Sequence, residues 1–230
     1  MIIAISQKQE QNIHGDLTDT LEHNYLNYLK QWNITPVIIP NNLSNLQTYL
    51  KQFKIDRIIL TGGNDIDPQS YNQPRPQNIL LVPQRDQTET TIIKYAIQHN
   101  IPLLGICRGM QFINVYFKGK IINIKQTFGP NVHLPRHAHS LNITDEYTKK
   151  IIGSQTTVNS YHNYAINQQT ISPQLRPFAQ SPDELIEGFY HPTLPIAGIL
   201  WHPERDSPDP EFNKKIINAF MNKELFWNQK

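Results

Sequence analysis

Short apolar segments alternate along this chain with longer segments in which apolar residues recur every three or four positions. The apolar segments are rich in Ile, Val and Leu without strict alternation, which is typical of strands covered by helices on both faces of a sheet. They lie at 2–6, 36–40, 57–63, 102–106 and 196–201. The helical spacing lies at 16–32, 86–99, 108–117 and 210–226. This order predicts an α/β fold with a doubly wound, mostly parallel sheet.

The second half of the chain is less regular than the first. Residues 119–144 mix short strand-like pieces with the segment "FGPNVHLPRHAHS", which is typical of a long surface loop. The chain has 230 residues, and it contains neither an internal repeat nor a low-complexity linker. We therefore expect one domain over residues 1–230.

Charge and composition narrow the classes of partner. The chain has 21 Lys and Arg against 19 Asp and Glu, and the basic residues are scattered rather than clustered. This balance favours a small-molecule partner over nucleic acid or a membrane surface, and it leaves a homodimer open. The N-terminus lacks the basic segment of a signal peptide, and no stretch approaches the roughly 20 apolar residues of a membrane helix. We expect a cytoplasmic protein.

The only cysteine, Cys107, stands where the apolar segment "PLLGI" meets a helical segment. Gly105 and Gly109 flank it at equal spacing, which allows a tight turn and close packing. A thiol at such a strand-to-helix turn resembles a nucleophile elbow, and the helix N-terminus would favour its thiolate. The alternative is a small apolar residue in the core. A single cysteine also excludes an intrachain disulfide.

A nucleophilic cysteine needs a base and a group that orients the base. In "GILWHPERD", His202 and Glu204 are two residues apart at the expected end of a strand, so their side chains should point to the same side. Sites in open α/β sheets form at the carboxyl ends of strands, where Cys107 should also lie. The alternative is a loop histidine beside a surface carboxylate.

Acyl transfer also needs hydrogen-bond donors for the oxyanion of the tetrahedral intermediate. The segment "RIILTGGNDIDP" runs from a strand into Gly62 and Gly63, where backbone N–H groups can face a ligand. The amides of Gly63 and of Arg108, the residue after the cysteine, are the expected pair. An ordinary glycine turn is the alternative.

The three segments "LTGGND", "GICRGMQ" and "WHPE", in this order, resemble the class I glutamine amidotransferase-like family. Within it they are most similar to the γ-glutamyl hydrolase branch, which includes γ-glutamyl-γ-aminobutyrate hydrolases. The resemblance implies a flavodoxin-like sheet and a triad of Cys107, His202 and Glu204, with no cofactor. "QRDQTE" and "VNSYHN" also match this branch. The substrate-binding residues that it implies are Gly62, Asn64, Arg85, Gln111, Asn159, Ser160, Tyr161 and His162.

Two departures from ammonia-delivering glutaminase subunits favour a free-standing hydrolase. Those subunits commonly carry a proline after the glycine pair and Leu-Gly-His or Leu-Gly-Asn after the cysteine. This chain has Asn64 and Asp65 at the first place and 108–110 reads Arg-Gly-Met. A glutaminase subunit and a non-catalytic binding module remain the alternative classes.

The leaving group is a further question. "TGGND", "IPLLGICRG", "NSYHNYAI" and "GILWHPERD" are also similar to hydrolases that release cytidine diphosphoramidate from a γ-glutamyl conjugate in capsule phosphoramidate synthesis. Loops 8–16, 64–83 and 126–140 should build the leaving-group pocket. Arg75 and Arg85 are cations that could meet a diphosphate, although Arg75 is better explained as a solvated loop charge.

Three histidines, His133, His137 and His139, lie close together in "VHLPRHAHS". Their spacing matches no common metal motif, and no cysteine or carboxylate accompanies them. We expect no metal there, but a strand with neighbouring surface histidines. The expected function is cysteine-dependent hydrolysis of a γ-glutamyl amide or phosphoramide bond.

Overall fold

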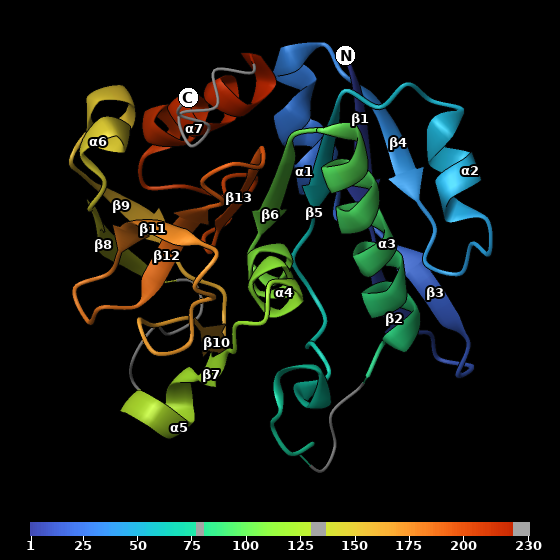
Figure 1. The fold of residues 1–230 in the computed structure, drawn as a ribbon, viewed down its shortest axis with the longest axis horizontal. Coiled ribbons are helices and arrows are strands. Elements are labelled where there is room, and N and C mark those ends of the chain that lie inside the picture. The colour runs from blue at the N-terminus through green and yellow to red at the C-terminus, as the bar shows by residue number, and fades with distance from the viewer. Residues whose placement is uncertain (77–80, 130–136, 223–230) are drawn as a thin grey trace.

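A mixed sheet of nine strands forms the centre of the computed structural model, which describes residues 1–76, 81–129 and 137–222 (Figure 1). The strands lie side by side in the order β4-β1-β5-β6-β13-β12-β11-β8-β9. Neighbours from β4 to β13 are parallel, and neighbours from β13 to β9 are antiparallel. In chain order the parallel strands are arranged 2-1-3-4-5, which is the flavodoxin-like order. The predicted fold class is confirmed.

The nine strands of this sheet are short. They are β1 (Ile2–Ser6), β4 (Thr35–Ile39), β5 (Arg57–Leu60), β6 (Leu103–Ile106), β8 (Ala138–Ile143), β9 (Gln155–Asn159), β11 (Arg176–Gln180), β12 (Ile186–Tyr190) and β13 (Ile196–Ile199). Two small sheets pair β2 (Lys8–Gln11) with β3 (Leu17–Thr20), and β7 (Ile122–Asn123) with β10 (Tyr164–Ala165).

Helices cover both faces of the sheet. They are α1 (His23–Leu29), α2 (Leu46–Lys51), α3 (Pro83–His99), α4 (Arg108–Tyr116), α5 (Ile124–Phe128), α6 (Glu146–Ile152) and α7 (Pro210–Asn222), with 3-10 turns η1 (Lys30–Trp32) and η2 (Pro68–Tyr71). In Figure 1, β7, β10 and α5 gather below α4, at the end of the molecule toward which β6 points.

The apolar side chains of the parallel strands divide between two cores. Ala4 and Ile58 pack with apolar residues of α2, α3 and α4. Ile3, Ile5 and Ile59 pack with apolar residues of α1 and α7 on the other face. Because successive side chains of a strand point to opposite faces, a strand buried on both faces must be apolar throughout. This explains why the runs of Ile, Val and Leu predicted the strands of the parallel part of the sheet.

The expected helix over 16–32 is wrong in its first third. Residues Leu17–Thr20 form β3, which pairs with β2 in a hairpin, and α1 begins only at His23. Asn12 fixes the turn, because its Oδ1 accepts the N–H groups of His14 and Asp16, both at 2.9 Å. Leu17 supplied the helical spacing, yet it is 50% exposed. The hairpin has no buried apolar face, so the spacing of apolar residues in the sequence could not predict it.

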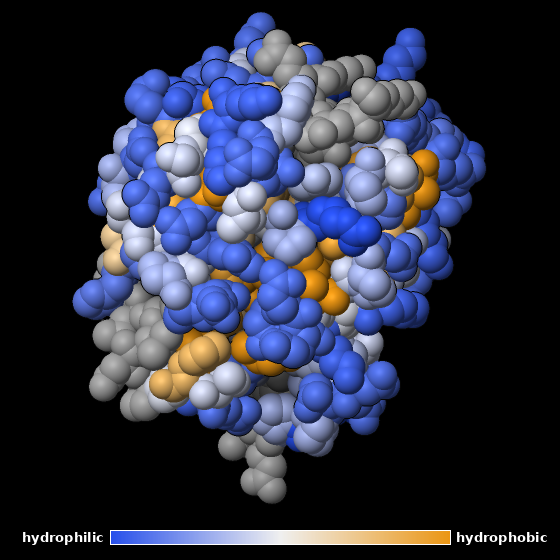
Figure 2. Space-filling model, turned by 60° about the vertical axis from the view of Figure 1, so that its left-hand side comes forward, coloured by the Kyte–Doolittle hydropathy of each residue, from blue (hydrophilic) through white to orange (hydrophobic). Residues whose placement is uncertain are grey.

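The surface in Figure 2 is mostly hydrophilic, with hydrophobic side chains confined to narrow areas between polar ones. Ile13, at the tip of the β2–β3 hairpin, is 95% exposed. None of the helices in the described part of the chain combines the length and apolarity that crossing a bilayer requires.

Candidate active site

Cys107 occupies a sharp turn between β6 and α4. Its backbone has φ 52° and ψ −107°, a positive-φ conformation that residues other than glycine rarely adopt. Its N–H donates to the Ile199 carbonyl at 2.8 Å, so the turn stays attached to β13. The following helix lies very close to β5, because a Cβ on Gly109 would stand 2.2 Å from the Leu60 carbonyl oxygen. This is the geometry of a nucleophile elbow.

His202 and Glu204 lie in the segment after β13. Their side chains are buried, and His202 Nδ1 is 2.6 Å from Glu204 Oε1. The expected reason was wrong, because β13 ends at Ile199 and the two residues meet in an irregular turn rather than on a strand. With Nδ1 bound to the carboxylate, Nε2 is the imidazole nitrogen left for chemistry.

Cys107 and Glu204 act together on the charge of His202. Burial lowers the pKa of His202, but the nearby Cys107 and Glu204 raise it by more than burial lowers it, so the pKa is about 10. The raised pKa of His202 favours the protonated imidazole. An imidazolium beside a sulfur is the arrangement that favours a thiolate nucleophile.

The turn after β5 lies against both of these side chains. A Cβ on Gly62 would stand 2.8 Å from His202 Cε1 and 3.6 Å from Cys107 Cβ. The N–H of Gly62 donates to the hydroxyl of Tyr25 at 2.9 Å, so this amide is already used within the protein. Tyr25 is buried in α1. The sequence showed it only as one apolar position of a helix, and no local signal marked its place beside the site.

Gly63 follows with φ +115°, a conformation suited to glycine. A Cβ there would stand 2.9 Å from Arg85 Nη1 and 2.9 Å from Lys8 Cβ. Asn64 does not offer its side chain to a ligand, because its Nδ2 donates to the Gln9 carbonyl at 2.6 Å and its Oδ1 accepts from the Gln9 amide at 2.9 Å. The predicted contact of Asn64 with substrate stays a prediction.

Arg85 is fully buried in α3. Its guanidinium donates to the carbonyls of Thr61 and Gly62 at 2.7 and 3.0 Å and to Glu89 Oε1 at 3.0 Å, so it is directed at the protein. The other expected cation, Arg75, pairs with Asp67 at 2.6 Å but is half-exposed. A contact of either guanidinium with substrate or a diphosphate stays a prediction.

Asn159, at the end of β9, supports the His202 segment. Its Nδ2 donates to the carbonyls of His202 and Asp206, both at 2.8 Å, and its Oδ1 accepts the His202 N–H at 2.9 Å. Both donors and one of the two acceptor positions of the side chain are thus directed at the backbone. The substrate-binding role of Asn159 stays a prediction.

The remaining predicted residues surround the same region. Gln111 Nε2 donates to the Tyr164 carbonyl at 3.0 Å, and the Ser160 N–H donates to the His137 carbonyl at 3.0 Å. The Tyr161 ring meets the His202 ring edge to face, with centroids 5.6 Å apart. The Ser160 amide is therefore engaged, whereas Tyr161 lies directly beside the imidazole.

Two of the other histidines approach the buried carboxylate of Glu187. His139 Nε2 and His162 Nε2 lie 3.4 and 3.6 Å from Glu187 Oε1. Burial lowers the pKa of His139, but its interaction with Glu187 outweighs this and raises it. His133 lies outside the described residues. Within the described ranges, no three His, Cys, Asp or Glu side chains come together as a metal site.

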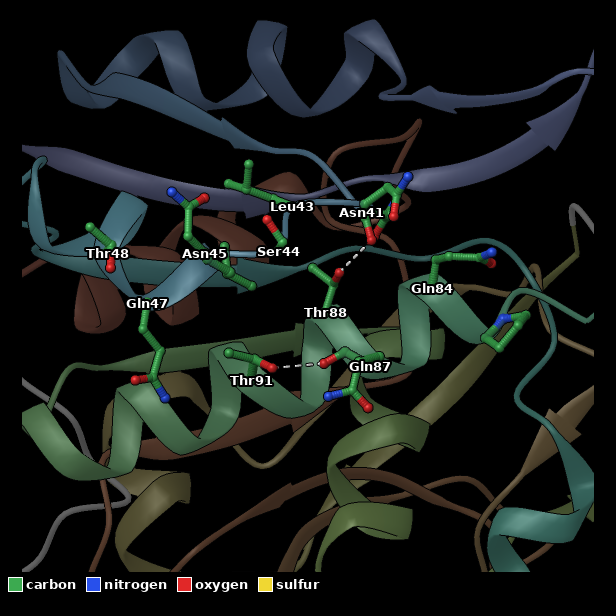
Figure 3. Close-up of a pocket in the computed structure, with 13 residues that line it drawn as sticks. Asn41, Leu43, Ser44, Asn45, Gln47, Thr48, Gln84, Gln87, Thr88 and Thr91 are labelled. Carbon is green, nitrogen blue, oxygen red and sulfur yellow. Dashed lines mark hydrogen bonds between the residues drawn. The ribbon is translucent and has the colours of Figure 1, made fainter.

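Two clefts open near these elements. The first, of about 860 Å³, lies between residues 41–48 and α3, and its lining side chains are uncharged (Figure 3). Thr88 closes part of it by donating to the Asn41 carbonyl at 2.8 Å. The second, of about 390 Å³, is lined by residues that include Tyr71, Arg75 and Tyr164. Since Gln111 binds the Tyr164 carbonyl, the second cleft adjoins the helix that follows Cys107.

The comparison with protein families agrees with this geometry. The Peptidase C26 profile matches residues 1–204. The chain belongs to the Peptidase C26 family. The predicted resemblance to class I glutamine amidotransferase-like proteins is thereby confirmed at the level of the family.

Several curated relatives share this family likeness. The chain is 32% identical over 197 residues to a putative glutamine amidotransferase-like protein of Lactococcus lactis, covering 82% of each chain. It is 33% identical over 175 residues to a γ-glutamyl-CDP-amidate hydrolase of Campylobacter jejuni, covering 76% of this chain and 74% of that protein. It is 28% identical over 230 residues to the γ-glutamyl-γ-aminobutyrate hydrolase of Escherichia coli K12, covering 91% and 88%. These relatives support a glutamine amidotransferase-like hydrolase.

Solved structures support the fold. The glutaminase domain of CTPS from Trypanosoma brucei superposes with a TM-score of 0.64 at 17% identity, covering 96% of this chain and 94% of that one. At this identity the likeness concerns the fold alone.

Proposed function

We propose that this Peptidase C26 member is a cysteine-dependent hydrolase that cleaves γ-glutamyl amide or phosphoramide bonds and releases glutamate. The observation that carries the proposal is the buried His202–Glu204 pair, in which His202 Nδ1 lies 2.6 Å from Glu204 Oε1. His202 and Cys107 both lie against the turn at Gly62. A nucleophile, a base and a group that orients the base are the minimum set for acyl transfer through a covalent intermediate.

In the acylation step, the Cys107 thiolate attacks the γ-carbonyl carbon. The carbonyl electron pair moves to the oxygen, where the N–H groups of Gly63 and Arg108 stabilise the negative charge. Protonated His202 gives its Nε2 proton to the leaving nitrogen as the carbon–nitrogen bond breaks. The products are a glutamyl thioester on Cys107 and the free amine or phosphoramide.

In the deacylation step, neutral His202 takes a proton from water, and the resulting hydroxide attacks the thioester carbonyl. The same two amides stabilise the second oxyanion. The intermediate collapses to glutamate and the Cys107 thiolate, which leaves His202 protonated again. Glu204 keeps the imidazole oriented and stabilises its charged form throughout. No metal or cofactor takes part in this sequence of steps.

The Campylobacter jejuni relative, 33% identical, makes γ-glutamyl-CDP-amidate the first substrate to test. If this chain hydrolyses the same substrate, cytidine diphosphoramidate is the leaving group, and it would serve in capsule modification. Arg85 is held in a fully buried ion pair with Glu89, whereas Arg75 is half-exposed beside Asp67 and lines the second cleft, so Arg75 is the cation better placed to meet the diphosphate. γ-Glutamyl-γ-aminobutyrate is the second candidate, because the Escherichia coli hydrolase aligns over 91% of this chain.

A panel of substrates tests the proposal by measuring release of glutamate. It contains γ-glutamyl-CDP-amidate, γ-glutamyl-γ-aminobutyrate, γ-glutamyl polyamines, polyglutamate and glutamine. We expect hydrolysis of at least one γ-glutamyl conjugate by the wild-type protein and none by Cys107→Ala. If no conjugate releases glutamate while iodoacetamide still alkylates Cys107, the proposal is wrong. Glutamine turnover that rises strongly only with an added synthase would indicate a glutaminase subunit instead.

A further inference from the structure

A buried cluster of four charged side chains lies behind the proposed oxyanion site. Its members are Arg85, Asp86 and Glu89 of α3 and Arg108 of α4. Glu89 forms ion pairs with both arginines, and Asp86 forms a second ion pair with Arg108. Arg85 and Glu89 are completely buried and Arg108 is 1% exposed, so solvent screens the cluster little.

Arg85 fixes the peptide that follows Gly62. Its Nη2 donates to the carbonyl oxygens of Thr61 and Gly62 at 2.7 and 3.0 Å, and its Nη1 donates to Asn64 Oδ1 at 3.0 Å. In a planar trans peptide, the C=O and the N–H point in opposite directions. Because the Gly62 carbonyl faces Arg85, the N–H of Gly63 is turned away from it.

The second oxyanion donor depends on the same cluster. The N–H of Arg108 is among the first amides of α4, which the helix itself does not use. The Arg108 side chain binds Glu89 and Asp86, and its Nε donates to the Asn64 carbonyl at 3.1 Å. Arg108 therefore ties the turn of Cys107 to the turn of Gly63.

Glu89 joins the two arginines. Its Oε1 accepts from Arg85 Nε and from Ser6 Oγ, both at 3.0 Å, and its Oε2 accepts from Arg108 Nη1. Although burial opposes ionisation, Arg108 and Arg85 hold the pKa of Glu89 below its usual range. The carboxylate is therefore charged at neutral pH, and one side chain fixes the distance between the two loops.

We propose that Arg85, Glu89 and Arg108, with Asp86 as the second partner of Arg108, act as positioning residues that hold the Gly63 and Arg108 amides in a preformed oxyanion site. This inference rests on the proposed function, because it assumes acyl transfer at Cys107. It assigns the side chain of Arg108 a role beyond the presence of its backbone amide. It also gives Arg85 a positioning role although its side chain is fully buried.

Arg85→Lys tests the proposal in the full-length protein. Lysine keeps the positive charge beside Glu89, but one ammonium cannot reproduce the forked contacts with Thr61, Gly62 and Asn64. Since losing one oxyanion donor costs about 10²- to 10³-fold in kcat, we expect a fall of about 10- to 100-fold, with KM near that of the wild type. Alkylation of Cys107 by iodoacetamide creates no oxyanion, so its rate should not change.

Arg57→Lys is the matched control. Arg57 is also a buried arginine that donates to backbone carbonyls, those of Asp56, Phe220 and Met221, but it lies at the start of β5, away from the site. We expect Arg57→Lys to lower thermal stability without lowering kcat. If Arg85→Lys is folded and has the kcat of the wild type, or if Arg57→Lys lowers kcat equally, the proposal is overturned.

Asp86→Asn provides a second test if Arg85→Lys does not fold. Asp86 is partly exposed, with 19% of its side chain accessible, so its replacement disturbs the core less. A lower kcat with unchanged KM and unchanged alkylation supports the proposal, and a kcat equal to that of the wild type overturns it. Failure of the proposed function is recognised separately, because the wild-type protein would then release no glutamate.

Discussion

Asn159 binds the backbone on both sides of His202, and replacing it distinguishes a role in supporting this backbone from a role in binding substrate. Asn159→Ala deletes three hydrogen bonds of 2.8–2.9 Å at a position that is 5% exposed. At about 1 kcal/mol net for each bond, the free energy of unfolding should fall by roughly 3 kcal/mol. The carbonyls and the N–H that lose their partner add to this cost where water cannot reach them.

Urea unfolding and steady-state kinetics of the same variant form the assay. Because Asn159 holds the backbone of the base, we expect kcat to fall while KM stays close to that of the wild type. If Asn159 only bound substrate, Asn159→Ala would raise KM and leave the free energy of unfolding unchanged. Asn142→Ala is the control, since this side chain of β8 is exposed and accepts a hydrogen bond from the side chain of Gln155; we expect it to change stability by about 0.5 kcal/mol or less. A loss below about 1 kcal/mol for Asn159→Ala would refute the reasoning.

Three further outcomes follow from the site. Cys107→Ser should abolish measurable glutamate release while circular dichroism stays unchanged; residual turnover near the wild-type rate would exclude Cys107 as the nucleophile. Gly109→Ala should destabilise the protein by about 1–3 kcal/mol or more in thermal unfolding, because the new methyl group would stand 2.2 Å from the Leu60 carbonyl oxygen. His202 has a folded-state pKa of about 10 against about 6.5 unfolded, so its protonation stabilises the fold below about pH 6.5 and this contribution is lost as pH rises toward 10. The stability difference between wild type and His202→Gln should therefore shrink across that range, and a constant difference in urea unfolding would contradict the assignment.

The parallel half of the fold could be predicted because its strands are buried on both faces. Runs such as 2–6 and 102–106 have no other stable environment, and the intervening helices repeat their apolar residues on one side. The antiparallel half gave weaker signals. Gln155–Asn159 alternates exposed with buried positions over only its first four residues, and Arg176–Gln180 shows no alternation at all. The β2–β3 hairpin gave none, because polar side chains form nearly all of it.

The sequence predicted which side chains gather at the site better than it predicted what each one does. Cys107, His202 and Glu204 stood out because a cysteine, a histidine and a carboxylate lie within three residues of strand-like segments and match the motifs "GICRGMQ" and "WHPE", although β13 ends at Ile199, before His202. Arg85 and Asn159 stood in the right segments, but their partners are backbone carbonyls of residues more than 20 positions away. Such contacts depend on tertiary packing, which no local pattern records. Tyr25 was missed for the same reason.

The position of β13 has a consequence for how this enzyme family can vary. This strand pairs with β6 in parallel on one side and with β12 in antiparallel on the other. Cys107 is attached to the parallel half, whereas the backbone of His202 is bound by Asn159 from the antiparallel half. Cys107 and His202, the proposed nucleophile and base, are thus held by different halves of the sheet. We expect a small shift of β8 and β9 to move His202 relative to Cys107, so that changes far from the reacting atoms alter the rate and leave the thiol unaltered.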